Sequence, residues 1–207
     1  MGPRELLDNM GPRPADQPVF YYDLGSPYAY LAAERVNHVL PVVPLWQPIL
    51  LGGIWKQTGG GTWSVTDRRA EGMAEVESRA AHRGLQPMRW PEPWPTPTTT
   101  AMRAATFAQQ GGRAVAFSLA AFRQAFAGGR DLSVTDNVLI AAAACELHPR
   151  AVLKAIETRS VKDRLRAATE QAAARGVVGV PTVAVGDELF WGDDRLEEAA
   201  SRLRSVP

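Results

Sequence analysis

Cysteine and histidine are scarce in this sequence. Its 207 residues include one cysteine, Cys145, and three histidines, His38, His82 and His148. A single cysteine excludes an internal disulfide, a Cys-x-x-Cys redox pair and a cysteine-based zinc site. The histidines lie far apart and lack the spacing of metal ligands, so we expect surface or helix-capping positions for them and no bound metal. Cys145 lies in an apolar helical segment, which favours a buried packing position.

An excess of one charge and long apolar runs are also missing. The 23 basic and 22 acidic residues give a formal net charge of +1. No overall field therefore favours nucleic acid or an anionic membrane surface as a partner. No apolar run approaches the roughly 20 residues that cross a bilayer, and residues 1–17 lack the apolar region of a signal peptide. The sequence predicts a cytoplasmic protein with a short disordered leader.

Apolar residues are plentiful enough for a large core, since 45% of the chain is hydrophobic. Residues 18–24 predict a strand, and residues 28–39 predict a helix because apolar residues recur there every three or four positions. Residues 41–47 predict a second strand if its prolines lie at an edge or bulge. Near the other end, a hairpin that turns on Gly186-Asp187 is expected, followed by a final helix.

The middle of the chain is predicted to be helical. Residues 66–84 are charged and helical in character, whereas five prolines between Pro87 and Pro97 predict an extended connector. Alanine-rich periodic segments then predict helices at about residues 98–110, 113–128, 135–147 and 149–175. The mixed ends and the helical centre together indicate a split α/β domain with a helical insertion.

The stretch FYYDLGSPYAYL, residues 20–31, passes from strand to helix through Ser26 and Pro27. A serine at the N-cap followed by proline starts a helix well, because the hydroxyl accepts a backbone amide and proline prefers the required φ. A helix N-terminus also carries partial positive charge, so the same place can hold an anion such as a thiolate or carboxylate. The local sequence leaves the structural and the functional interpretation open.

A second motif, near the C-terminal end of the sequence, favours the functional interpretation of Ser26. The early residues Asp23, Ser26, Pro27 and Tyr28 fit a D-x-x-S-P-Y pattern, and residues 178–196 read VGVPTVAVGDELFWGDDRL. Together the two motifs resemble the thioredoxin-like DsbA superfamily, and more closely its branch of 2-hydroxychromene-2-carboxylate isomerases and kappa-class glutathione transferases. The resemblance covers roughly residues 18–204.

The resemblance implies an α/β, thioredoxin-like fold with a large all-helical insertion. The thioredoxin-like domain would be split between residues 18–50 and 176–207, and residues 51–175 would form the insertion. The family's G-V-P-T motif supplies a cis-proline, which corresponds to Pro181 here. Relatives also suggest a homodimer.

The implied activity follows from what replaces the redox cysteines. Disulfide oxidoreductases of the superfamily carry Cys-x-x-Cys at this helix start, where this chain has Ser26 and Ala29. It therefore cannot exchange disulfides there, and Ser26 is expected to stabilise the thiolate of bound glutathione or of another low-molecular-weight thiol. In the isomerase the thiolate adds to a small aromatic or conjugated carboxylate, allows rotation about the former double bond, and leaves.

Two alternatives stay open. A kappa-like glutathione S-transferase would conjugate the thiol to an electrophile. A non-catalytic thioredoxin-fold module would instead bind peptides or proteins at the edge beside the cis-proline.

Further contacts are implied residue by residue. The thiol would meet the backbone of Val180, beside Pro181, and then a loop formed by Trp191, Gly192, Asp193 and Asp194. In that loop Asp194 would bind the γ-glutamyl ammonium, although either aspartate could instead cap the final helix. Lys56 and Tyr28 are expected on the substrate side, with Lys56 meeting a carboxylate unless it is simply a solvated surface lysine.

The chain departs from the family pattern in two places. After Lys56 the family commonly has Gly-Asn, whereas this chain has glycines that include Gly60, and a Pro-x-Asn motif becomes PTPTTT at residues 95–100. These departures put the substrate in doubt more than the fold. Tryptophans gather in sequence around both segments, where they would form aromatic walls for a flat substrate or part of the insertion core: Trp55, Trp63, Trp90 and Trp94.

Overall fold

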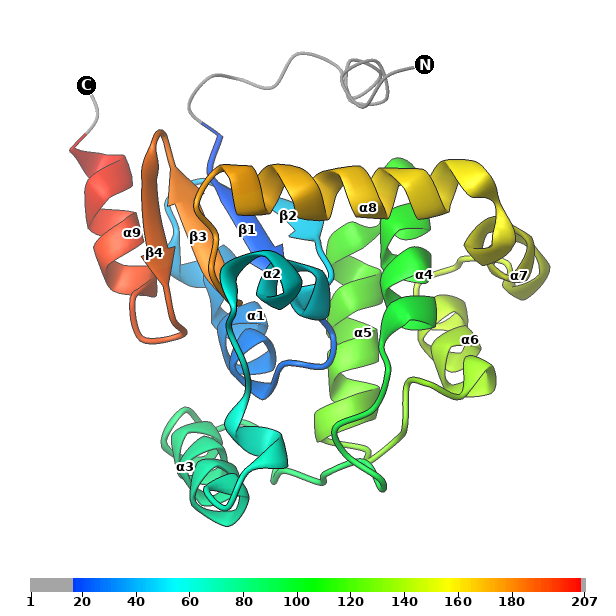
Figure 1. The fold of residues 1–207 in the computed structure, drawn as a ribbon, viewed down its shortest axis with the longest axis horizontal. Helices are drawn as coiled ribbons and strands as arrows, with labels where there is room; N and C mark the ends of the chain where they lie inside the picture. The colour runs from blue at the N-terminus through cyan, green and yellow to red at the C-terminus, as the bar shows by residue number, and fades with distance from the viewer. Residues whose placement is uncertain (1–16, 206–207) are drawn as a thin grey trace.

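The computed structural model describes residues 17–205. The leader expected over residues 1–17 lies outside this part of the chain, apart from Gln17. Figure 1 shows the sheet and the terminal helix on one side of the molecule and a group of helices from the middle of the chain on the other. Within residues 17–205 no helix is long and apolar enough to cross a membrane.

The sheet has four strands in the order β2-β1-β3-β4. Their bounds are β1 Val19–Tyr22, β2 Leu45–Pro48, β3 Thr182–Val185 and β4 Glu188–Trp191. Strand β1 pairs with β2 in parallel and with β3 antiparallel, and β3 pairs antiparallel with β4. The predicted hairpin is confirmed, with Gly186 at φ 55° between its strands.

The second strand begins later than the sequence predicted. It was expected over residues 41–47, but β2 starts at Leu45, which pairs with Val19. Pro44 lies just before the strand, because proline has no N–H to give to a ladder. β2 is an edge strand, which is the position where the proline that ends it is tolerated.

Helices make up most of the rest of the described chain. They are α1 Pro27–Val39, α2 Leu51–Thr58, the 3-10 turn η1 Trp63–Val65, α3 Arg69–His82, α4 Thr99–Gln110, α5 Ala114–Phe126, α6 Thr135–Ala143, α7 Pro149–Glu157, α8 Arg159–Ala174 and α9 Leu196–Arg204. Residues 85–98 contain neither helix nor strand, so the proline-rich connector is confirmed.

Two helix predictions were wrong in detail. The single helix expected over residues 149–175 is two helices, because Thr158 has extended backbone and its hydroxyl accepts a hydrogen bond from Val161 N to cap α8. The helix expected over 135–147 ends at Ala143, since Glu146 takes a left-handed conformation with φ 63°.

The hydrophobic core runs through the sheet and the central helices without interruption. Trp46 packs edge-on against Phe20 at 4.9 Å between ring centroids, and Tyr22 reaches Phe122 of α5 at 6.0 Å. The Tyr22 hydroxyl is also 2.6 Å from Ser118 Oγ on the same helix. These contacts fix the end of β1, and therefore the turn that leads into α1.

The positions predicted for the cysteine and the three histidines are confirmed. Cys145 is a free, buried thiol that is 5% exposed. His148 is the N-cap of α7 and accepts a hydrogen bond from Arg150 N at 3.2 Å. His38 and His82 are exposed.

Candidate functional site

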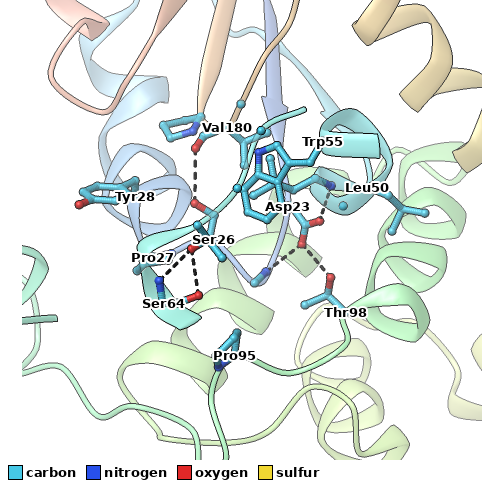
Figure 2. Close-up of a pocket in the computed structure, with 18 of the residues that line it drawn as sticks. Asp23, Ser26, Pro27, Tyr28, Leu50, Trp55, Ser64, Pro95, Thr98 and Val180 are labelled. Carbon is cyan, nitrogen blue, oxygen red and sulfur yellow. Dashed lines mark hydrogen bonds between the residues drawn. The ribbon is translucent and has the colours of Figure 1, made fainter. Parts of the chain in front are cut away.

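A cavity of about 1040 Å³ lies beside the N-terminus of α1. Its walls come from the turn after β1, from α2, from residues 59–64 and 94–99, and from the two segments that flank the hairpin. All of the site residues predicted from the sequence line it, namely Ser26, Tyr28, Lys56, Val180, Pro181, Trp191, Gly192, Asp193 and Asp194. Figure 2 shows part of this cavity.

Ser26 is the N-cap of α1, as predicted, and it is 5% exposed. Its hydroxyl oxygen accepts a hydrogen bond from Ala29 N at 3.2 Å. The same hydroxyl donates to the carbonyl oxygen of Val180 at 3.5 Å, as Figure 2 shows. That distance is long for an O–H···O bond. The peptide bond between Val180 and Pro181 is cis.

Asp23 holds three separate segments together at the cavity (Figure 2). It is 4% exposed, and its carboxylate accepts hydrogen bonds from Gly25 N at 2.9 Å, Leu51 N at 2.9 Å and Thr98 Oγ1 at 2.8 Å. Burial raises the pKa of Asp23, and the three hydrogen bonds partly offset that rise. The sequence identified this residue only as part of a motif and gave no sign of its distant partners.

Asp193 is buried in an ion-pair cluster with helix α3. Its Oδ1 lies 2.7 Å from Arg79 Nη1, and its Oδ2 lies 2.6 Å from Arg83 Nη2. The capping alternative is wrong, because the N-cap of α9 is Arg195 and no side chain caps that helix. Neither Arg79 nor Arg83 was predicted from the sequence to belong to the site. Their spacing of four residues, which places them on one face of a helix, was the available signal.

Tyr28 is tied to the same helix. Its hydroxyl donates to Glu75 Oε2 at 3.2 Å, and the Arg79 guanidinium carbon lies 5.5 Å from the centre of its ring. Burial raises the pKa of Tyr28, and the negative charge of Glu75 adds to the rise. The hydroxyl proton is therefore already donated to Glu75, and the oxygen can still accept a hydrogen bond.

Lys56 lies in the last turn of α2 and is exposed at the cavity. Among residues 17–205 no carboxylate forms an ion pair with its ammonium. Asp194 is likewise exposed and has no ion-pair partner in the described chain. These two opposite charges are therefore available to a ligand.

Three of the four clustered tryptophans line the cavity, and the fourth does not. Trp55, Trp63 and Trp94 form walls, whereas Trp90 packs against Trp94 at 4.6 Å and donates to Glu77. The two interpretations of these residues are therefore both partly correct. The aromatic walls favour a flat apolar ligand group.

Each of three cavity indoles rests on a glycine. A Cβ atom added to the glycine would lie 2.4 Å from Trp55 at Gly60, 2.5 Å from Trp63 at Gly72 and 2.6 Å from Trp191 at Gly179. Because such distances are sterically forbidden, only glycine lets these rings lie where they do. The family departure at Gly60 thus coincides with the place that the Trp55 ring occupies.

The chain is similar in sequence to two named enzymes. A 2-hydroxychromene-2-carboxylate isomerase of Sphingobium xenophagum is 29% identical over 194 residues, which are 89% of this chain and 96% of that protein. Glutathione S-transferase kappa 1 of Homo sapiens is 26% identical over 211 residues, which cover 94% of this chain and 93% of that protein.

Solved structures share the fold, and the family is shown by sequence. A structure of 2-hydroxychromene-2-carboxylate isomerase matches with a TM-score of 0.81 at 22% identity, over 90% of this chain and 95% of that chain. A probable DsbA oxidoreductase from Streptomyces coelicolor matches with a TM-score of 0.69 at 19% identity, over 93% and 91% of the two chains. The predicted thioredoxin-like α/β fold with inserted helices is confirmed. Residues 19–204 match the family model for the DSBA-like thioredoxin domain, and the chain belongs to that family.

Proposed function

We propose that this protein is a glutathione-dependent isomerase of a small aromatic or conjugated carboxylate. The observation that carries the proposal is the position of the Ser26 hydroxyl, at the N-terminus of α1 and opposite Val180 in a large cavity. One sequence relative is named 2-hydroxychromene-2-carboxylate isomerase, which supports this class of reaction.

The hydrogen bonds of Ser26 suit a thiolate. Its oxygen accepts from Ala29 N, which leaves the hydroxyl proton to be donated outward. The present acceptor, Val180 O, is 3.5 Å away and uncharged, so a thiolate would be the stronger acceptor. The partial positive charge of the helix N-terminus adds to this effect. A free thiol has a pKa of about 8.5, so both interactions raise the fraction of reactive thiolate at neutral pH.

The proposed reaction returns its thiol. The thiolate forms a C–S bond to the conjugated carbon, and the π electrons of the double bond move onto the neighbouring carbonyl group. The carbon–carbon bond is then single and rotates. When the electrons return, the double bond re-forms and the C–S bond breaks, so glutathione leaves unchanged.

The other contacts are assigned by charge and by backbone position. The backbone of Val180, beside Pro181, would pair with the peptide of the thiol, and Trp191 and Gly192 would flank it. Asp194 would bind the γ-glutamyl ammonium, because its carboxylate is exposed at the cavity. Lys56 would bind a carboxylate, and the Trp55 and Trp63 rings would contact the flat part of the substrate.

A kappa-like glutathione S-transferase is the second candidate, since the other sequence relative is glutathione S-transferase kappa 1. The two reactions differ in their thiol balance. An isomerase converts its substrate without consuming glutathione, whereas a transferase accumulates a conjugate and consumes one thiol for each turnover.

Ligand binding to the folded protein tests the proposal. A thermal-shift series with glutathione, cysteine and other low-molecular-weight thiols should show a raised melting temperature for glutathione, because a ligand that binds only the native state stabilises it. If no thiol raises the melting temperature, a peptide-binding or protein-binding module would be favoured instead. The proposal also includes the predicted homodimer and cytoplasmic location, which sedimentation and cell fractionation would test.

A further inference from the structure

The charged groups that line the cavity fall into two kinds. Asp23 and Asp193 are buried, and their oxygens are already engaged within the protein. Lys56, Arg79 and Asp194 also line the cavity and are at least partly exposed. A ligand therefore meets two cations and one anion.

Arg79 is held firmly yet keeps donors to spare. Its Nη1 donates to Asp193 Oδ1 at 2.7 Å, its Nη2 donates to Glu75 Oε1 at 2.5 Å, and its guanidinium lies over the Tyr28 ring. A guanidinium has five N–H groups in one plane, and these two bonds use two of them. The side chain is 33% exposed and lines the cavity, so a ligand there can contact it.

We infer that Arg79 binds the α-carboxylate of the γ-glutamyl group of the thiol, next to the ammonium that Asp194 binds. The inference rests on the proposed function and deepens it. The α-amino and α-carboxylate groups share one carbon atom, so their partners must lie close together. Arg79 is bonded to Asp193, the chain neighbour of Asp194, whereas Lys56 is carried by α2.

The charge pattern of the cavity agrees with this assignment. Glutathione has two carboxylates and one ammonium, and the cavity offers Lys56 and Arg79 against Asp194. Lys56 is then left for the glycyl carboxylate. Asp193 becomes a positioning residue, since it is buried and acts by holding Arg79 in place. The cavity should consequently prefer thiols that carry a free α-amino acid group.

The test compares two ligands on two proteins. One ligand is glutathione, and the other is its analogue with 4-aminobutanoyl in place of γ-glutamyl, which keeps the ammonium and lacks the α-carboxylate. Calorimetry should show that Arg79→Met weakens glutathione binding by about 10-fold to 100-fold, the range for a hydrogen bond between charged groups. The analogue should bind the wild-type protein about as weakly as glutathione binds the Arg79→Met variant. The Kd of the analogue should change by no more than about 2-fold between the wild type and Arg79→Met.

Each other outcome would overturn the inference. An equal loss of affinity for both ligands means that Arg79 acts only by holding the loop of residues 191–194 through Asp193. No loss of affinity for either ligand means that Arg79 does not contact the thiol. Arg68→Met is the matched control, because Arg68 pairs with Glu71 on the exposed start of α3 and does not line the cavity. If glutathione fails to bind wild type, the proposed function itself has failed.

A conservative variant covers loss of folding. If Arg79→Met does not fold, Arg79→Lys keeps the charge and loses the planar pair of donors. It should weaken glutathione binding by about 3-fold to 10-fold and leave the analogue unchanged, in line with the loss of one arm of a bidentate contact. Unchanged glutathione binding by this variant would contradict the inference.

Discussion

The Ser26 hydroxyl donates to the carbonyl oxygen of Val180, a residue 154 positions later in the chain, at 3.5 Å. The contact joins the start of α1 to the segment before β3, and both residues line the cavity. Because the bond is long, the Ser26 hydroxyl can donate instead to a better acceptor that enters the cavity, and little free energy is lost by breaking the contact with Val180 O.

Ser26→Ala should reduce turnover strongly and the stability of the fold only slightly. We expect turnover to fall by about 10-fold to 1000-fold, as when one anion-stabilising donor is removed. The free energy of unfolding should fall by only about 0.5–2 kcal/mol, the usual value of an N-cap. Steady-state kinetics and denaturant unfolding measure the two effects. Ser64→Ala is the control, since Ser64 also lines the cavity but bonds to Thr62, and an equal loss of turnover in both variants would remove Ser26 from its proposed role.

Ser26→Cys should allow the protein to form a stable mixed disulfide with glutathione. The new thiolate should attack glutathione disulfide, form a mixed disulfide at position 26 and release one glutathione thiolate. Intact mass should rise by one glutathionyl group, and peptide mapping should place it on residue 26. Cys145 should stay unmodified because it is 5% exposed and burial raises its pKa. An adduct on Cys145 alone would contradict the proposed path of the thiol.

Gly60→Ala should displace the Trp55 ring. The added methyl would lie 2.4 Å from the indole, so the ring must move. We expect a shift in tryptophan emission, a loss of stability on the order of 1 kcal/mol and weaker binding of aromatic substrate. Gly61→Ala is a close control, because a Cβ there meets nothing within 4 Å. Similar spectra and affinities for the two variants would mean that Trp55 forms no part of the substrate wall.

Asp23→Asn should change how stability depends on pH. Burial raises the native pKa of Asp23 above its ordinary value of 3.8, so the folded protein binds more protons than the unfolded chain between the two pKa values. The free energy of unfolding of the wild type therefore falls as pH rises from about 4 through the native pKa of Asp23. The Asp23→Asn variant lacks this dependence on pH, because asparagine does not titrate. Wild type should lose stability relative to the variant over that range in denaturant titrations. A relative gain would show that the hydrogen bonds to Asp23 outweigh its burial.

Local signals predicted the parts of the fold that neighbouring residues decide. The N-cap at Ser26, the hairpin turn at Gly186 and the proline-rich connector all follow from the preferences of single residues, and all are confirmed. The capping threonine at position 158 was overlooked within a long alanine-rich pattern. The division of the chain into a thioredoxin-like domain and a helical insertion at residues 51–175 stays a prediction. The hydrophobic core is continuous through both parts.

Contacts between distant residues could not be predicted in the same way. Helix α2 contains Gly52 and Gly53, which argue against a helix, and it forms because it packs against α8, where Leu50 N donates to Thr169. Arg79 and Asp193 are separated by 114 positions, so no local pattern pairs them. A buried aspartate beside two arginines becomes visible only when the chain is folded.

The carboxylate of Asp23 also links the turn before Ser26 to the opposite parts of the cavity lining. It connects the turn to α2 and, through Thr98, to the connector residues 94–98 that line the cavity. In the proposed isomerase, a mutation at position 98 would thus alter this wall without replacing Ser26 or Pro181. The cavity can therefore change shape on the side of Thr98 while the Ser26 hydroxyl and the Val180-Pro181 edge keep their positions.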